Sequence, residues 1–181
     1  MALILLVSYL VLLALFRSIL LPLKAVFMNT LSLAASFGML VLVFQDGWLA
    51  GVFRFEPLGY VEATLPVLMF ALLFGLSMDY EVFLLVRVKE AHDSGSSNTE
   101  AVALGLERSG RVITSAATVV IVVSLAFVTA DIVLIKAVGL GAAVAIFIDA
   151  TVVRTLLVPA TMKLLGEWNW WAPGWLCRGA R

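Results

Sequence analysis

The sequence is 181 residues long, 63% hydrophobic and only 13% charged, and its mean hydropathy is +1.11. About a quarter of the residues in a soluble domain are charged, so this composition excludes an ordinary water-soluble protein and indicates a membrane protein. The formal net charge is zero, and the single cysteine, Cys177, excludes an internal disulfide and a cysteine-built metal site.

Apolar runs predict an all-α membrane protein, a polytopic bundle of about five transmembrane helices without a large soluble domain. About 20 residues are needed to cross a hydrocarbon core of ~30 Å, and the candidate spans are 1–16, 25–44, 65–86, 112–130 and 132–165. The first span is short and does not look like a cleaved signal peptide, because it lacks a basic start and a small-residue cleavage site. It is either the end of a longer helix or a tilted helix in a locally thinned membrane.

The polar segments between the spans are unequal in length. Residues 45–64 predict an external interfacial segment, and 89–111 a cytoplasmic loop with a short amphipathic helix. Ser97 and Glu100 have the spacing of a capping box at the start of that helix. His92, in the same loop, is expected to be solvated. It is the single histidine of the sequence, so the sequence argues against metal catalysis. The tryptophans of 166–181 predict a cytoplasmic tail at headgroup depth.

Basic residues set the predicted orientation. Alternating spans place most of them on one side and two on the other. The first group is Arg17, Lys24, Arg87, Lys89, Arg108, Arg111, Lys163, Arg178 and Arg181; the second is Arg54 and Lys136. The positive-inside rule then predicts an external amino terminus and a cytoplasmic carboxyl terminus.

Charged residues within the spans are the strongest functional candidates, because burying each charge costs at least ~2.5–3.5 kcal/mol on insertion scales. They are Asp79 and Glu81 in the third span and Asp149 and Arg154 in the fifth. Asp79 lies roughly 12 Å inside the cytoplasmic boundary by helical rise, where an acid can stay protonated until water or a cation reaches it. Arg154 either pairs with Asp149, which requires a bent helix because i and i+5 stack poorly, or extends to the headgroups.

Hydroxyl groups near the same depth form a second set of candidates. Tyr80 can donate and accept hydrogen bonds, and it diverges from Asp79 by about 100° around the helix. This neighbouring pair therefore suits bonding to a reciprocal pair on another helix. Thr114, Ser115 and Thr118 lie at a similar depth and either line a proton path or serve as ordinary interhelical packing contacts.

Small residues predict where helices approach one another closely. They occur as Ser32-x-x-x-Ser36, Gly139-x-Gly141 and Gly141-x-x-x-Ala145. Gly75 stands one turn before Asp79, where a close backbone approach would exclude lipid from the carboxyl group. General membrane packing is the alternative explanation for all of them.

Several motifs occur in the order typical of one transporter family. The segment Phe74-Gly-Leu-Ser-Met-Asp-Tyr-Glu81-Val-Phe-Leu-Leu85 resembles the proton-relay helix of the MMPL family, in the resistance-nodulation-division (RND) superfamily. The segments 17–24, 110–114, 149–159 and 165–171 are similar to the same family, so that the resemblance covers essentially the whole chain.

The resemblance implies export of lipids, lipid-linked molecules or hydrophobic drugs from an actinobacterial or similar plasma membrane, driven by the proton-motive force. Protons would be the coupling ion, with no cofactor, metal or nucleic acid involved. Family members have about twelve spans in two related halves, and the spans here match the last five. Asp79 and Tyr80 match the second Asp-Tyr pair, and Glu81 the acid that often follows it. The expected partners are membrane lipids and a first half, or second subunit, with the reciprocal pair.

Two other functions remain open at this point. The chain could be a non-transporting fragment of a truncated or split gene that acts only by associating with a partner. An intramembrane protease built on an Asp79–Asp149 dyad is a further alternative, although the residues around these acids do not favour it.

Overall fold

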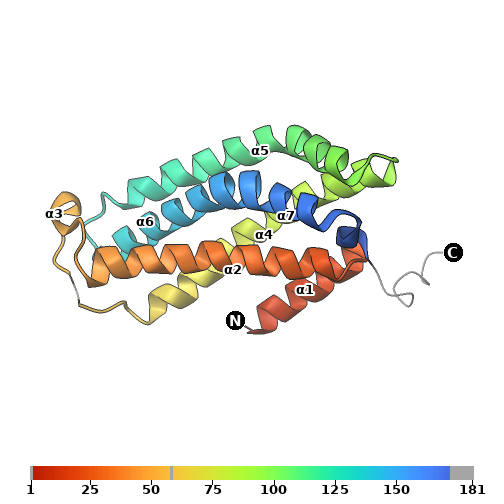
Figure 1. Ribbon diagram of the computed structural model, residues 1–181. Helices are drawn as coiled ribbons and strands as arrows, with labels where there is room; N and C mark the ends of the chain where they lie inside the picture. The colour runs from red at the N-terminus through yellow and green to blue at the C-terminus, as the bar shows by residue number, and fades with distance from the viewer. Residues whose placement is uncertain (1, 58, 172–181) are drawn as a thin grey trace.

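The computed structural model describes residues 2–57 and 59–171, and these are helical with turns and no strand, as Figure 1 shows. The predicted all-α class without a large soluble domain is confirmed. In chain order the elements are α1 (Ala2–Phe16), α2 (Leu20–Leu40), η1 (Val41–Gln45, a π-helix), α3 (Ala50–Phe53), α4 (Thr64–Asp93), α5 (Asn98–Phe127), α6 (Val133–Ile148), η2 (Asp149–Leu157, a π-helix), α7 (Val158–Leu165) and η3 (Gly166–Trp170, a 3-10 helix).

Four continuous helical stretches within the described residues are long and apolar enough to cross a membrane. They are Leu20–Gln45, Thr64–Asp93, Asn98–Phe127 and Val133–Trp170, and Ala2–Phe16 is a shorter apolar helix. In Figure 1 the long helices lie alongside one another, with α3 and the α5–α6 turn at one end of the bundle. The α1–α2 link, the α4–α5 turn and η3 lie at the other end.

The expected loop at 89–111 is much shorter in the structure. Helix α4 continues to Asp93 and α5 begins at Asn98, so that the expected amphipathic helix is the first part of α5. The capping box starts α5: the Ser97 hydroxyl accepts from the Glu100 backbone N–H at 3.4 Å, and the Glu100 carboxylate accepts from the Ser97 N–H at 3.1 Å. Both helices extend past their apolar parts because no proline interrupts them.

His92 differs from its expected place in a solvated loop. It lies in the last turn of α4, half-buried, and its ring stacks on Trp170 with centroids 4.2 Å apart. The expected tail at 166–181 begins as η3. Trp168 within η3 and Trp171 directly after it are exposed. Residues 172–181 of that tail, including Trp175, lie outside the described residues.

Buried polar side chains tie together three segments at the η3 end of the bundle. Ser18, in the α1–α2 link, donates to the Asn169 carbonyl at 2.5 Å. The amide nitrogens of Asn98 and Asn169 both donate to the Met162 carbonyl, at 2.9 and 2.7 Å. The Trp170 indole donates to the Asn98 side-chain oxygen at 3.1 Å. These bonds fix α7 and η3 against the starts of α2 and α5.

The apolar core is divided into two clusters along the bundle. One cluster includes Met28 of α2 and Leu84 of α4, towards the η3 end. The other includes Leu33 of α2, Phe74 of α4 and Ile146 of α6, towards the α3 end. Buried and half-buried polar residues lie between them on the same helices, including Asn29, Ser32, Ser77 and Asp149, and these form the candidate site.

Small residues hold α6 close to its neighbours. A Cβ at Gly139 would meet the Ser124 carbonyl oxygen of α5 at 2.5 Å and the Phe127 Cβ at 2.7 Å. The Ser36 hydroxyl of α2 donates to the Gly141 carbonyl at 2.9 Å. These contacts bring α2, α5 and α6 close together.

Candidate functional site

A π-helical turn brings together the two charges of the last span. In η2 the backbone advances by i→i+5 rather than i→i+4, so that residues five apart lie on one face. Arg154 consequently pairs with Asp149: its Nε and Nη2 lie 2.8 and 2.7 Å from Asp149 Oδ2. A bent helix was expected for this pair, but a change of helix type makes the pairing instead. Arg154 is buried, with 3% of its surface exposed. It does not extend to the headgroups.

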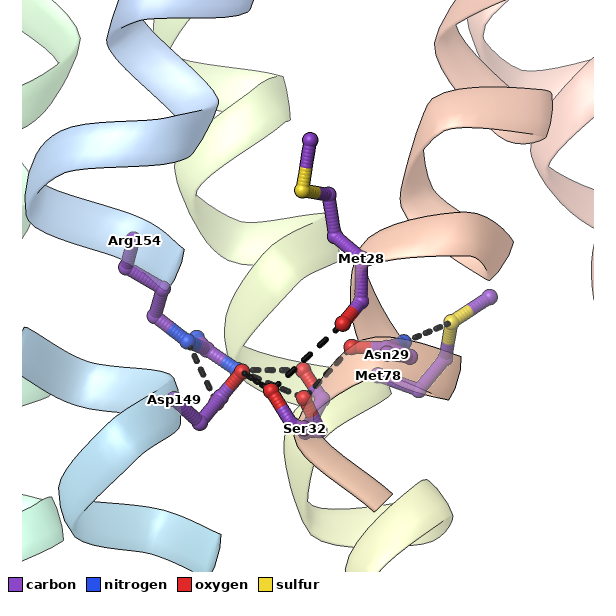
Figure 2. Close-up of polar contacts among 7 residues, drawn as sticks. Met28, Asn29, Ser32, Met78, Asp149 and Arg154 are labelled. Carbon is purple, nitrogen blue, oxygen red and sulfur yellow. Dashed lines mark hydrogen bonds and ion pairs between the residues drawn. The ribbon is translucent and has the colours of Figure 1, made fainter. Parts of the chain in front are cut away.

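The ion pair is held from two neighbouring helices. Arg154 Nη2 donates to the Ser77 carbonyl of α4 at 2.6 Å and lies 3.2 Å from the Ser77 hydroxyl. The Ser32 hydroxyl of α2 lies 3.3 Å from Asp149 Oδ1 and 3.4 Å from the Met28 carbonyl. Figure 2 shows Asp149 between Arg154 and Ser32. Both oxygens of Asp149 are therefore engaged, which leaves it a poor partner for the dyad of a protease.

A second set of bonds joins α2 directly to α4 in the same layer. The Ser77 hydroxyl donates to Asn29 Oδ1 at 2.6 Å. The Asn29 amide lies 3.7 Å from the Met78 sulfur (Figure 2). Asn29 is 2% exposed. Buried polar groups outside water are stable only when they are paired, so this network fixes the register between the helices.

Tyr80 lies against this network. The Arg154 guanidinium carbon is 5.3 Å from the centre of the Tyr80 ring, a cation–π distance. Tyr80 also lines a small cavity of about 20 Å³ together with Asn29, Ser77 and Asp149. That volume is enough for about one water molecule, and its walls carry hydroxyl, amide and carboxylate groups.

The Asp79 side chain faces away from the bundle. It is exposed, together with Leu68, Leu72 and Gly75, which recur every three to four residues along α4. Among the described residues, Asp79 has no hydrogen-bond partner within 3.5 Å and no ion-pair partner within 4.0 Å. A Cβ added at Gly75 would meet nothing within 4 Å, so the close approach expected at Gly75 is not made within this chain. This exposed stripe is called the open face of α4.

The remaining acid of the motif, Glu81, is buried with only 3% of its surface exposed. One of its oxygens, Oε1, has no partner among the described residues, and the same is true of Arg154 Nη1 and Lys24 Nζ. All three atoms belong to helices that pack around the ion pair. The site therefore holds more charged groups than its described hydrogen bonds satisfy.

The hydroxyls of α5 lie on an exposed face. Thr114 donates to the Gly110 carbonyl at 2.7 Å, Ser115 to the Val112 carbonyl at 3.0 Å, and Thr118 to the Thr114 carbonyl at 2.8 Å. Each bond stays within its own helix, and none reaches the Asp149–Arg154 pair. Within the described residues they are not part of the buried layer.

Sequence reasoning missed several members of this layer. Asn29 and Ser77 are not among the sequence-based candidates, and Ser32 is among them only as a packing residue. Lys24 had served only to set the orientation, although it is 8% exposed. An asparagine and a lysine within apolar runs were the available signal, because a polar group at membrane depth needs a partner.

The sequence comparisons identify the family of the whole chain. The sequence model of the MMPL family matches residues 1–179. The chain belongs to the MMPL family. Together with its four long apolar helices, this makes it a multi-pass membrane protein.

Three relatives illustrate the range of this family. The mycolic acid-containing lipids exporter MmpL11 of Mycolicibacterium smegmatis is 47% identical over 171 residues, which cover 94% of this chain and 18% of that protein. The heme uptake protein MmpL11 of Mycobacterium tuberculosis is 47% identical over 170 residues, 94% of this chain and 18% of that protein. The trehalose monomycolate exporter MmpL3 of M. tuberculosis is 46% identical over 181 residues, 98% of this chain and 19% of that protein.

The chain thus spans less than one fifth of the length of these relatives. The matched part is similar in proteins named for different cargoes and different directions of transport. The matched part is therefore common to MMPL proteins whose names differ in cargo and in direction of transport.

Proposed function

We propose that this chain is the carboxy-terminal membrane part of an MMPL exporter driven by the proton-motive force, with Asp79 and Tyr80 as its half of the proton relay. The cargo is a lipid or another hydrophobic compound, since the relatives named as exporters act on mycolic acid-containing lipids and trehalose monomycolate. The function is transport, with protons as the coupling ion, rather than covalent catalysis.

The observation that carries this proposal is the position of Asp79. It lies at membrane depth on the open face of α4, without a hydrogen-bond or ion-pair partner among the described residues. An unpaired carboxyl group in hydrocarbon is costly, so a partner surface or a proton has to neutralise it. Gly75, on the same face with nothing within 4 Å of its Cβ position, leaves room for a helix to come close.

The proposed partner is the amino-terminal half of the transporter, or a second subunit that carries the reciprocal Asp-Tyr helix. Protonation of Asp79 would remove its charge, weaken its bond to that helix and bias two arrangements of the halves. Tyr80 is held by the buried layer through Arg154, and we infer that it couples this change to the interior of the bundle. Glu81, Asp149 and Arg154 support the relay from that interior.

The proposed location is a bacterial plasma membrane, with the α1–α2 link, the α4–α5 turn and η3 in the cytoplasm. The basic residues Arg17, Lys89 and Lys163 belong to that end, and Arg54 and Lys136 to the other. The positive-inside rule supports this orientation. An accessible-cysteine labelling experiment on intact cells, with one cysteine introduced at Asp131 and another at Ser96, tests it directly.

The test of the relay is Asp79→Asn in the assembled transporter, with the chain co-expressed with the half that carries the reciprocal helix. We expect loss of proton-coupled lipid export, because asparagine cannot take up and release a proton. Asp131→Asn is the matched control, since Asp131 is an exposed residue of the α5–α6 turn, and it should leave export unchanged. Full export by Asp79→Asn would disprove the role of Asp79.

The fragment hypothesis is tested separately. A membrane segment with the reciprocal Asp-Tyr helix should co-purify with this chain, and Gly75→Leu on the open face should reduce its yield. Failure of any polypeptide with that helix to co-purify from the native membrane would contradict the proposed partner.

A further inference from the structure

Two buried residues of opposite charge, Lys24 of α2 and Glu81 of α4, are left without a direct partner. Lys24 is 8% exposed and Glu81 is 3% exposed. The Lys24 amine and Glu81 Oε1 make no hydrogen bond within the described part of the chain, and the two side chains are farther apart than the 4.0 Å of an ion pair. Because a lone buried charge is strongly unfavourable, each of these groups needs compensation from nearby.

The register of α2 and α4 brings these two residues to the same level of the bundle. The helices run in opposite directions (Figure 1), and the bond from Ser77 to Asn29 fixes one point of contact between them. Glu81 follows Ser77 by four residues, roughly 6 Å along α4 towards the η3 end. Lys24 precedes Asn29 by five residues, roughly 8 Å along α2 in the same direction. Lys24 and Glu81 therefore lie at matching heights on two helices that pack together.

The charges around each residue identify the compensation. Among the described residues, the charged groups that act on Glu81 are Arg154, Asp149 and Lys24, and the one that acts on Lys24 is Glu81. Arg154 attracts Glu81, but it already pairs with Asp149 at 2.7 Å, and Asp149 repels Glu81. The two contributions of that pair oppose each other, whereas Lys24 has only Glu81 to balance its charge.

We propose that Lys24 is the counter-ion of Glu81 and controls whether this carboxyl group holds a proton. A positive amine across the interface favours the carboxylate, and without that amine the carboxyl group would take a proton from the aqueous phase and lose its charge. Lys24 is thus a positioning residue that acts through Glu81, and Glu81 is a proton-binding site inside the bundle. The pairing of Asp149 with Arg154 stays intact in this exchange.

This inference does not rest on the relay proposed for Asp79. Asp79 lies on the open face of α4, whereas Lys24 and Glu81 lie in the interior, and the test measures proton binding by the isolated chain without export. Asp79→Asn therefore serves as the background for the test, because it removes a second carboxyl group of α4 from the spectra. Whether Asp79→Asn exports or not, the result expected for Glu81 is the same.

The experiment is infrared difference spectroscopy of the full chain in lipid vesicles, in the Asp79→Asn background. The C=O stretch of protonated carboxyl groups is followed across a pH titration, and Glu81→Gln identifies the band of Glu81 by removing it. Loss of one nearby opposite charge should make Glu81 hold its proton at least about tenfold more tightly, so in Lys24→Met the band should persist to higher pH. Lys24→Arg keeps the positive charge and should behave like the parent chain.

Lys136→Met is the matched control for the loss of a buried lysine. Lys136 is also 8% exposed, but its amine donates to the Phe53 carbonyl at 2.8 Å, at the α3 end of the bundle. This variant removes the same charge from an equally buried position without touching Glu81, and it should leave the Glu81 band where it is.

A stability measurement covers the case in which Lys24→Met folds poorly. Lys24→Met leaves Glu81 without its counter-ion, whereas Lys24→Met with Glu81→Gln removes both charges, so the double variant should resist denaturant better than Lys24→Met alone. A purely structural lysine would lower stability without moving the Glu81 band. An unmoved band in Lys24→Met, an equal change in Lys136→Met, or additive losses of stability in the double variant would overturn the proposal.

Discussion

Two regions of α4, less than one helical turn apart, differ in how their polar groups are treated. The side facing the bundle carries Ser77, bonded to Asn29 and to Arg154, and Tyr80, which lies against the Arg154 guanidinium. The open face carries Asp79 without a described partner. The inner side is bonded to its neighbours, and the outer side is the surface to which the proposed partner helix would bind.

This difference has a consequence for how variants should behave. Asn29, Ser77, Asp149 and Arg154 of the buried layer are joined by hydrogen bonds and an ion pair, so removing one of them leaves another unpaired in a medium without water. Asp79 and Gly75 on the open face make no contact of this kind with the described residues, so replacing them breaks no such bond within the chain. Stability should therefore depend on the inner side, while transport should depend on both.

The largest expected effect comes from breaking the ion pair. Arg154→Met should destabilise the chain by about 3–5 kcal/mol, because it leaves Asp149 as an uncompensated charge that is only 7% exposed. Unfolding of the purified chain in detergent micelles by added denaturant, followed by tryptophan fluorescence, measures the loss.

The double variant Asp149→Leu with Arg154→Met is the control for this prediction. It removes both charges together, so it should be less destabilised than either single variant. If the two single effects simply add in the double variant, the charges do not depend on each other and the description of the layer is wrong.

The ion pair also marks the limit of what sequence could predict. Apolar run lengths predicted the all-α class, because hydrocarbon permits only helices that satisfy their own backbone. The Ser97–Glu100 spacing correctly placed a helix start. The i to i+5 pairing of Asp149 and Arg154 required a π-helix, and a period of 3.6 residues does not reveal one.

Other differences have similar physical causes. The loop at 89–111 was expected because its residues are charged, but a helix can continue past the membrane boundary into water. The burial of the Lys24 amine could not be predicted, because a lysine near the end of a span is interpreted as a signal of membrane orientation. The direction of Asp79 could not be predicted, since all sides of α4 are apolar enough to face either lipid or protein.

A second prediction compares two glycines. Gly139→Ala should destabilise the chain by about 1–3 kcal/mol, because the added Cβ would lie 2.5 Å from the Ser124 carbonyl and force α5 and α6 apart. Gly75→Ala, on the open face, meets nothing within 4 Å and should stabilise α4 by up to about 1 kcal/mol through helix propensity. The same denaturation assay measures both. Equal effects at the two positions would show that the open face is already packed.

A third prediction compares two hydroxyl groups. Ser77→Ala should cost about 1 kcal/mol, because Asn29 loses its donor while Arg154 keeps the Ser77 carbonyl and Asp149. Thr114→Val removes an exposed hydroxyl that bonds only within its own helix, and it should change stability by less than about 0.5 kcal/mol. A larger loss in Thr114→Val than in Ser77→Ala would place the important hydroxyls on α5 instead.

The smallest expected effect on stability is at Asp79 itself. Asp79→Asn keeps the size of the side chain and removes a charge that has no described partner, so the free energy of unfolding of the isolated chain should change by less than about 0.5 kcal/mol. Asp149→Asn, the same change within the layer, weakens the contact with Arg154 and should lower it by clearly more. A large loss in Asp79→Asn would mean that Asp79 has a structural partner within this chain. Near-neutral stability combined with lost export would separate the relay group from the support that holds it.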